Sequence, residues 1–84
     1  MADEPIPGHL LDLQRAVLAA QAEVTAASAP PGRVADWPPE DQARLVAARQ
    51  AELDAVFALQ EARRGTPFEA VAQQWRLRDA AREA

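Results

Sequence analysis

Apolar residues recur at helical spacing in the first third of the chain. From His9 to Ser28, leucine, valine and alanine alternate at intervals of three and four residues, which is the pattern of one apolar face on an α-helix. The segment holds fewer than three heptads and therefore does not predict a free-standing coiled coil. Residues 1–8 carry two prolines and a glycine, and we expect them to form an irregular lead-in.

A second helix is predicted over residues 38–64. It follows a break at Pro30, Pro31 and Gly32, because such residues do not fit a helix interior. A proline pair and two acids open the segment; proline suits a first helical turn, and acids complement the positive end of the helix dipole. The break is long enough to reverse the chain, so the two helices should pair as an antiparallel hairpin.

The predicted second helix is apolar on two sides. Its bulky residues fall within about 120° of one another at about 100° per residue: Leu45, Val46, Leu53, Val56 and Phe57. Its alanines gather on another flank: Ala43, Ala47, Ala51, Ala58 and Ala62. We expect the bulky side to pack on the first helix. The alanine flank either faces solvent, since alanine is the best helix former, or receives a second partner.

A third helix is predicted over residues 67–82. Gly65 is suited to a left-handed cap that ends the second helix. Thr66, Pro67 and Glu69 follow in the order of an N-cap, a first helical position and the acid of a capping box. This helix either folds back over the hairpin or projects from it.

Composition supports an all-α fold that gains stability from a partner. Alanine supplies about a quarter of the 84 residues and cysteine is absent, so the chain favours helix and has no disulfides. A chain of this length is marginally stable alone. The favoured architecture is one domain over residues 9–84, a hairpin of two long helices with a shorter third helix, completed by dimerisation. The alanine and arginine bias also suits a GC-rich bacterial coding sequence.

Charge and hydropathy argue against two classes of partner. The net charge is −4, whereas nucleic-acid backbones are bound mainly by excess cations. No apolar run is long enough to cross a bilayer, and the first residues are acidic where a signal peptide is basic. We therefore expect a cytoplasmic protein with no membrane contact and no dedicated nucleic-acid surface.

The chain has few of the residue types that enzymes use for catalysis. It has one histidine, His9, one serine, two threonines and no cysteine, which leaves few nucleophiles or metal ligands. Paired acids such as Asp12 with Glu23, or Glu52 with Asp54, lack the acid and histidine spacing of a di-metal bundle. We predict no catalytic, cofactor-binding or metal-binding residues, and no enzymatic activity.

Six residues are candidate interface positions: Arg49, Leu53, Phe57, Gln60, Phe68 and Trp75. Arg49 and Gln60 interrupt the bulky side of the second helix. Either they make polar contacts across an interface, or Arg49 pairs locally with Glu52 or Asp41. Phe57 is favoured as a core residue, whereas core and interface positions are equally open for Trp75.

These features predict a small helical protein–protein interaction module, such as an adaptor, assembly factor or accessory subunit. Its expected partner is a second copy of the chain or another protein. The alternative is a small DNA-binding or antitoxin-like regulator that uses the arginine-bearing C-terminal helix. Residues 68–82 look faintly like a helix-turn-helix, but Arg76 stands where that motif usually has a glycine. A continuous amphipathic helix is favoured there.

Overall fold

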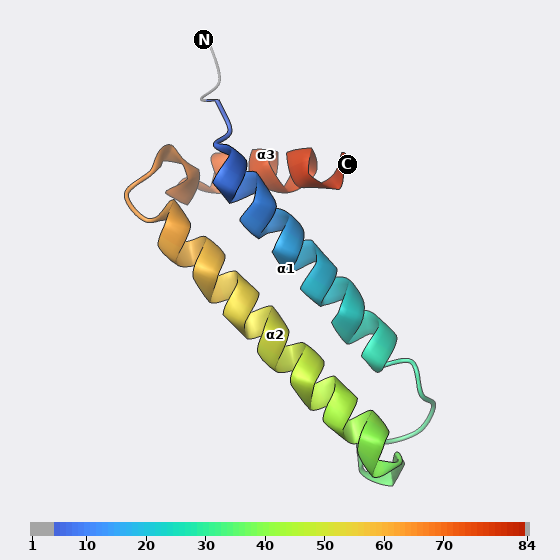
Figure 1. Cartoon of the computed structure of the whole chain (residues 1–84). Helices are drawn as coiled ribbons and strands as arrows, with labels where there is room; N and C mark the ends of the chain where they lie inside the picture. The colour runs from blue at the N-terminus through green and yellow to red at the C-terminus, as the bar shows by residue number, and fades with distance from the viewer. Residues whose placement is uncertain (1–4, 84) are drawn as a thin grey trace.

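Three α-helices and two short 3-10 turns make up the part of the chain that the computed structural model describes, residues 5–83. Helix α1 spans Gly8–Ala27 and α2 spans Pro39–Arg63; they run antiparallel and side by side (Figure 1). Helix α3, Val71–Arg82, crosses near the start of α1. The described residues contain no strand, so the predicted all-α hairpin with a shorter third helix is confirmed.

The hairpin boundaries lie within a residue of the sequence prediction. Pro39 occupies the first turn of α2 together with two acids, and Arg63 lies in its last turn, so charges complement the dipole at both ends. Gly65 adopts φ of 75°, the left-handed conformation that terminates the helix. Residues 5–7 have no regular structure, and α1 begins at Gly8. The rest of the predicted lead-in, like Ala84, lies outside the described residues.

The third helix begins later than predicted. Thr66 caps as expected, since its hydroxyl oxygen accepts from the Phe68 backbone N–H at 3.1 Å. The turn that follows, however, is a 3-10 helix over Pro67–Glu69, called η2, and Ala70 is extended with ψ of 138°. An unbroken helix would place Phe68 and Leu77 about 180° apart, because they are nine residues from each other. The break lets both side chains enter the same core cluster.

The core has two parts at opposite ends of an elongated molecule of 54 × 22 × 19 Å. At the three-helix end the buried cluster contains Leu10, Val17, Leu59, Phe68 and Leu77. At the loop end a smaller cluster contains Ala27, Trp37, Leu45 and Ala48. Helix α3 and η2 thus fold back over one end of the hairpin, which settles the choice between folding back and projecting.

The buried side of α2 differs from the predicted one. Leu45 is buried and Val56 half-buried, but Val46, Leu53 and Phe57 are 69%, 51% and 62% exposed. The expectation that the whole bulky side packs on the first helix was therefore wrong, as was the core position favoured for Phe57. The buried side instead centres on Leu45, Ala48 and Leu59. Phe68 and Leu77 complete the cluster around Leu59, and Trp37 completes the cluster around Leu45 and Ala48, so this is the side of α2 that large residues from outside α1 also cover.

Candidate interaction surface

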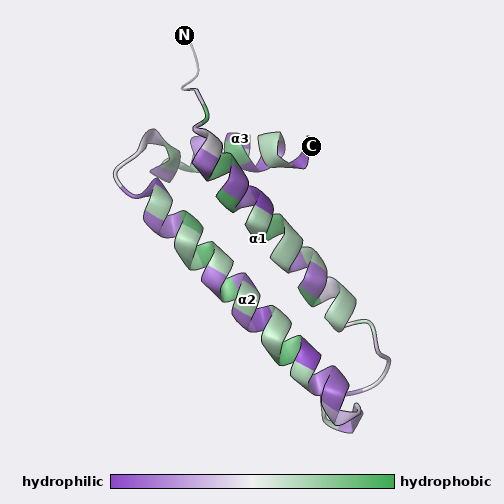
Figure 2. Ribbon diagram, in the orientation of Figure 1, coloured by the Kyte–Doolittle hydropathy of each residue, from purple (hydrophilic) through white to green (hydrophobic). Residues whose placement is uncertain are grey.

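An exposed apolar stripe runs along the outer side of α2. Figure 2 shows hydrophobic positions recurring over the whole length of this helix. Val46, Leu53 and Phe57, each more than half exposed, lie within about 40° of one another at 100° per residue. Their direction is roughly 140° away from that of Leu45, Ala48 and Leu59, which face the core. The stripe therefore points away from the rest of the chain.

Three polar residues share this side of α2. Arg49, Gln50 and Gln60 are exposed, and together with the apolar stripe they fill a sector of about 100°. We call these six residues the α2 outer face: Val46, Arg49, Gln50, Leu53, Phe57 and Gln60. The side chains come from positions separated by three or four residues, which is the spacing of a helix that pairs with another helix.

Arg49 has no ionic partner among the residues that the structure describes. The local pair with Glu52 or Asp41 that the sequence left open is therefore not formed. Asp54 flanks the opposite edge of the α2 outer face and accepts a hydrogen bond from Gln50 Nε2 at 3.0 Å. One edge of the face thus presents a cation and the other an anion.

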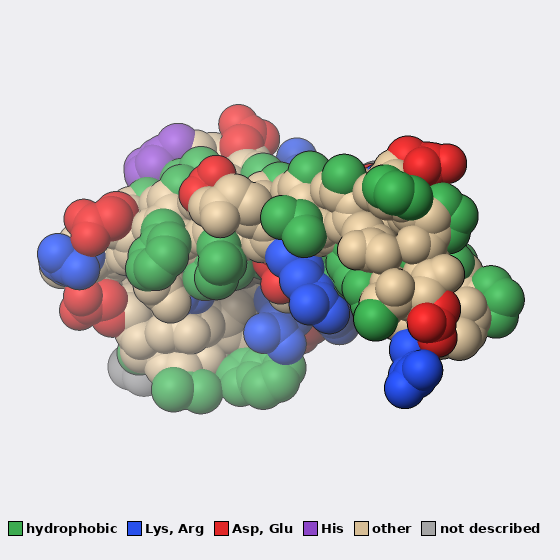
Figure 3. Space-filling model, turned by 90° about the horizontal axis from the view of Figure 1, so that it is seen from below, with side chains coloured by type: hydrophobic (Ala, Val, Ile, Leu, Met, Phe, Trp, Pro, Cys, Tyr) green, Lys and Arg blue, Asp and Glu red, His purple; other side chains and the backbone are tan. Residues whose placement is uncertain are grey.

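The alanine flank lies beside the α2 outer face. Ala43, Ala47, Ala51 and Ala58 are exposed, while Ala62 is half-buried and packs against the three-helix core cluster. Figure 3 shows one face of the molecule, on which hydrophobic side chains are spread along the surface and arginine side chains gather near the middle. The four exposed alanines thus extend the apolar surface of α2 beyond the α2 outer face.

A second, smaller apolar area lies on α3. Val71 and Trp75 are 67% and 55% exposed, and their spacing of four residues places them on one side of the helix. The Arg78 guanidinium carbon lies 4.5 Å from the centroid of the Trp75 ring, a cation–π distance. One face of the tryptophan is thereby covered within the chain.

The structure brings four of the six predicted interface candidates together. Arg49, Leu53, Phe57 and Gln60 share the α2 outer face, and Trp75 is exposed on α3. Phe68 is only 2% exposed and belongs to the core, so it is not an interface residue of the described chain; the break at Ala70 turns it inward. Sequence reasoning missed Val46, Gln50 and Asp54 as members or neighbours of this face. The seven-residue interval from Val46 to Leu53 was the available signal.

Helix α3 runs without interruption through Arg76, but the continuous helix favoured over residues 68–82 is broken at Ala70. Arg76 hydrogen-bonds Gln73 and lies 5.6 Å from the Phe68 ring centroid. The Arg78 guanidinium lies over one face of the Trp75 ring. The described residues therefore show no turn at the position where a helix-turn-helix requires one.

Within residues 5–83, no three histidine, cysteine, aspartate or glutamate side chains are placed to hold a metal ion. His9 is exposed in the first turn of α1. Over the same range, none of the helices combines the length and apolar character that crossing a bilayer requires. Comparison of the chain with protein-family models, with curated proteins and with solved structures found no match.

Proposed function

We propose that this protein is a helical protein–protein interaction module that works by pairing the α2 outer face with the same face of a second copy. The observation that carries the proposal is the exposure of Val46, Leu53 and Phe57 on the side of α2 opposite its core. Exposing a face of this kind to water is unfavourable, and burying it against a matching helix recovers that free energy. The proposal includes no catalytic activity.

Five of the six residues occupy positions that fit the core of a helix pair. Val46, Leu53 and Gln60 recur every seven residues, and Gln50 and Phe57 form a second row with the same interval. Two such alternating rows are typical of knobs-into-holes packing, in which side chains of one helix fit between those of another. Two hairpins joined in this way form a four-helix arrangement in which the two copies of α2 are central and the two copies of α1 are outside.

The charges at the edges favour a parallel orientation of the two copies. Arg49 and Asp54 lie on opposite edges of the α2 outer face and are five residues apart. In a parallel pair, opposite edges meet, and residues with this separation form interhelical ion pairs. Twofold symmetry then supplies two Arg49–Asp54 contacts. In an antiparallel pair like edges meet, so these two residues do not.

Sedimentation velocity over a concentration series, with the wild-type chain, tests self-association. We expect a dimer at high concentration that dissociates on dilution. Leu53→Glu should abolish it, because a carboxylate would be desolvated at the centre of the interface. Val71→Glu is the matched control: it introduces the same charge at an exposed apolar residue of α3 and should leave the dimer intact. A wild-type chain that remains monomeric at millimolar concentration would contradict the proposal.

A charge exchange tests the parallel orientation. Arg49→Asp and Asp54→Arg should each weaken the dimer by roughly tenfold, since each creates two like-charge contacts at the edges. The double variant should restore wild-type affinity, because the ion pairs re-form with reversed polarity. If the double variant is as weak as the product of the single changes, the copies do not pair in parallel.

A further inference from the structure

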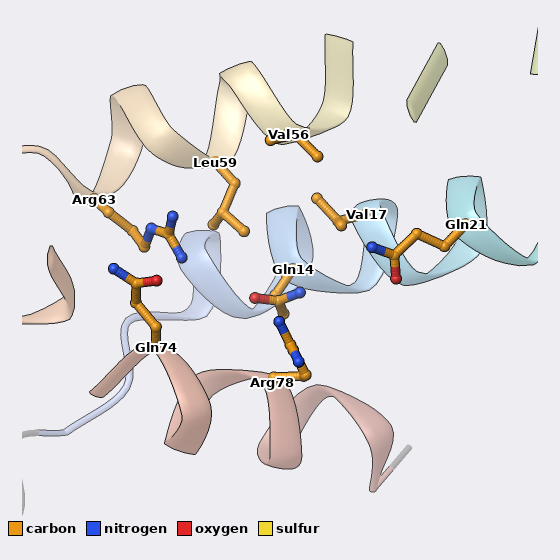
Figure 4. A pocket seen from close by; sticks show the side chains of 8 residues that line it. All are labelled: Gln14, Val17, Gln21, Val56, Leu59, Arg63, Gln74 and Arg78. Atoms are coloured by element: carbon orange, nitrogen blue, oxygen red, sulfur yellow. The ribbon is translucent and has the colours of Figure 1, made fainter. Parts of the chain in front are cut away.

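A cavity of about 150 Å³ opens where the three helices meet. Val17, Val56 and Leu59 form its apolar wall. The remaining lining is polar and comes from all three helices: Gln14 and Gln21 of α1, Arg63 of α2, and Gln74 and Arg78 of α3. Figure 4 shows the ends of Gln14, Arg63, Gln74 and Arg78 extending into the same space.

The cavity lining is positively charged although the chain as a whole is acidic. Two arginines line it and no aspartate or glutamate does, while the net charge of the chain is −4. Neither Arg63 nor Arg78 forms an ion pair with any of residues 5–83. Both residues are half-buried, so the lining carries two positive charges that no ion-paired carboxylate of the described residues neutralises, and it favours an anion.

Gln14 indicates that the cavity serves a polar ligand. The residue is 5% exposed, yet its amide makes no hydrogen bond to another described residue. No side-chain nitrogen or oxygen among the described residues is both inaccessible and unpartnered, so the Gln14 amide meets solvent, and the cavity that it lines provides the access.

The Gln74 side chain is held in place by a hydrogen bond to the backbone. Its Nε2 donates to the Glu69 carbonyl oxygen at 2.6 Å, which fixes the side chain at the edge of the cavity (Figure 4). The site therefore combines two planar guanidinium forks and the Gln14 amide with an apolar wall. Guanidinium forks match the paired oxygens of phosphate and carboxylate groups.

We propose that this cavity binds a small oxyanion, a phosphate or carboxylate group, with Arg63 and Arg78 as its charge partners and Gln14 as an amide donor. The size of the cavity restricts the ligand to an inorganic ion or a short organic acid. The site lies on the inner side of the three-helix end, away from the α2 outer face, and does not depend on self-association.

The test is a nuclear magnetic resonance titration of the isotope-labelled full chain with inorganic phosphate and, separately, with succinate. Sodium chloride keeps the ionic strength constant in both series. We expect saturable shifts, with one common dissociation constant, at the side-chain resonances of Gln14, Arg63 and Arg78. The exposed Arg33 resonance serves as an internal control and should not move. Saturation by only one of the two ions would support the site and assign its ligand class.

Two variants complete the test. Arg63→Gln and Arg78→Gln should each weaken binding at least tenfold, whereas Arg33→Gln, which removes a cation far from the cavity, should not change it. Circular dichroism confirms that each variant is folded. The proposal is overturned if neither ion gives saturable shifts in the wild-type chain, or if all arginine resonances shift together in proportion to added salt.

Discussion

Trp37 donates its indole N–H to the carbonyl oxygen of Pro31, with 3.2 Å between the two heavy atoms. The ring is 7% exposed and packs with Ala27 of α1 and Leu45 of α2. The residue therefore closes the loop between the long helices and fills the core cluster at that end.

Replacement of Trp37 should show how far the hairpin depends on this contact. Trp37→Ala should lower the free energy of unfolding by about 3–5 kcal/mol, because it empties the centre of a small cluster. Trp37→Phe keeps an aromatic ring and should cost less. Urea denaturation followed by circular dichroism measures both. Trp75→Ala is the matched control, since that ring is 55% exposed; equal losses for Trp37→Ala and Trp75→Ala would contradict the assigned burial.

Truncation of the two phenylalanines should affect different quantities, the stability of the monomer for Phe68 and self-association for Phe57. Phe68→Ala should cost about 3–5 kcal/mol of stability because the side chain is almost fully buried. Phe57→Ala should change the stability of the monomer by no more than about 0.5 kcal/mol, as is usual for exposed positions, but should weaken self-association. Thermal unfolding at low protein concentration gives the first quantity and sedimentation the second. A large stability loss for monomeric Phe57→Ala would mean that this residue belongs to the core.

Gly65 should tolerate substitution poorly even though it has space for a side chain. Its φ is 75°, and a Cβ added at this position would have no other atom within 4 Å, so the cost of Gly65→Ala is conformational. We expect a loss of about 1–2 kcal/mol. Gly8→Ala has equally open surroundings without a positive φ and should be neutral or slightly stabilising. Paired thermal denaturation curves compare the two; equal effects would exclude the backbone explanation.

Gln14→Met should raise the stability of the ligand-free protein. The two side chains are similar in size, and methionine removes a buried amide that has no partner among the described residues. We expect a gain of about 1 kcal/mol in the free energy of unfolding. The same variant should bind phosphate or succinate more weakly than the wild-type chain does. A loss of stability would show that the amide is well hydrated and is not kept at a cost.

The helices and their ends are largely readable from local sequence. Pro30, Pro31 and Gly32 do not fit the interior of a helix, and Gly65 can adopt the left-handed conformation that ends one. Both effects depend on local backbone sterics and not on tertiary contacts. The starts of α1 and α2 follow from similar signals. The all-α class, the hairpin and the order of the helices could therefore be predicted before any tertiary contact was known.

Only the tertiary structure decided which faces are buried. Helical periodicity showed two apolar sides on α2, but the choice of the side with Leu45, Ala48 and Leu59 depended on the bulk that α1 and η2 bring to the interface. The break at Ala70 has the same origin, since it satisfies a core that needs both Phe68 and Leu77. The cavity beside Gln14 likewise exists only where three helices meet. Periodicity is a property of one helix, whereas close packing is a property of all of them together.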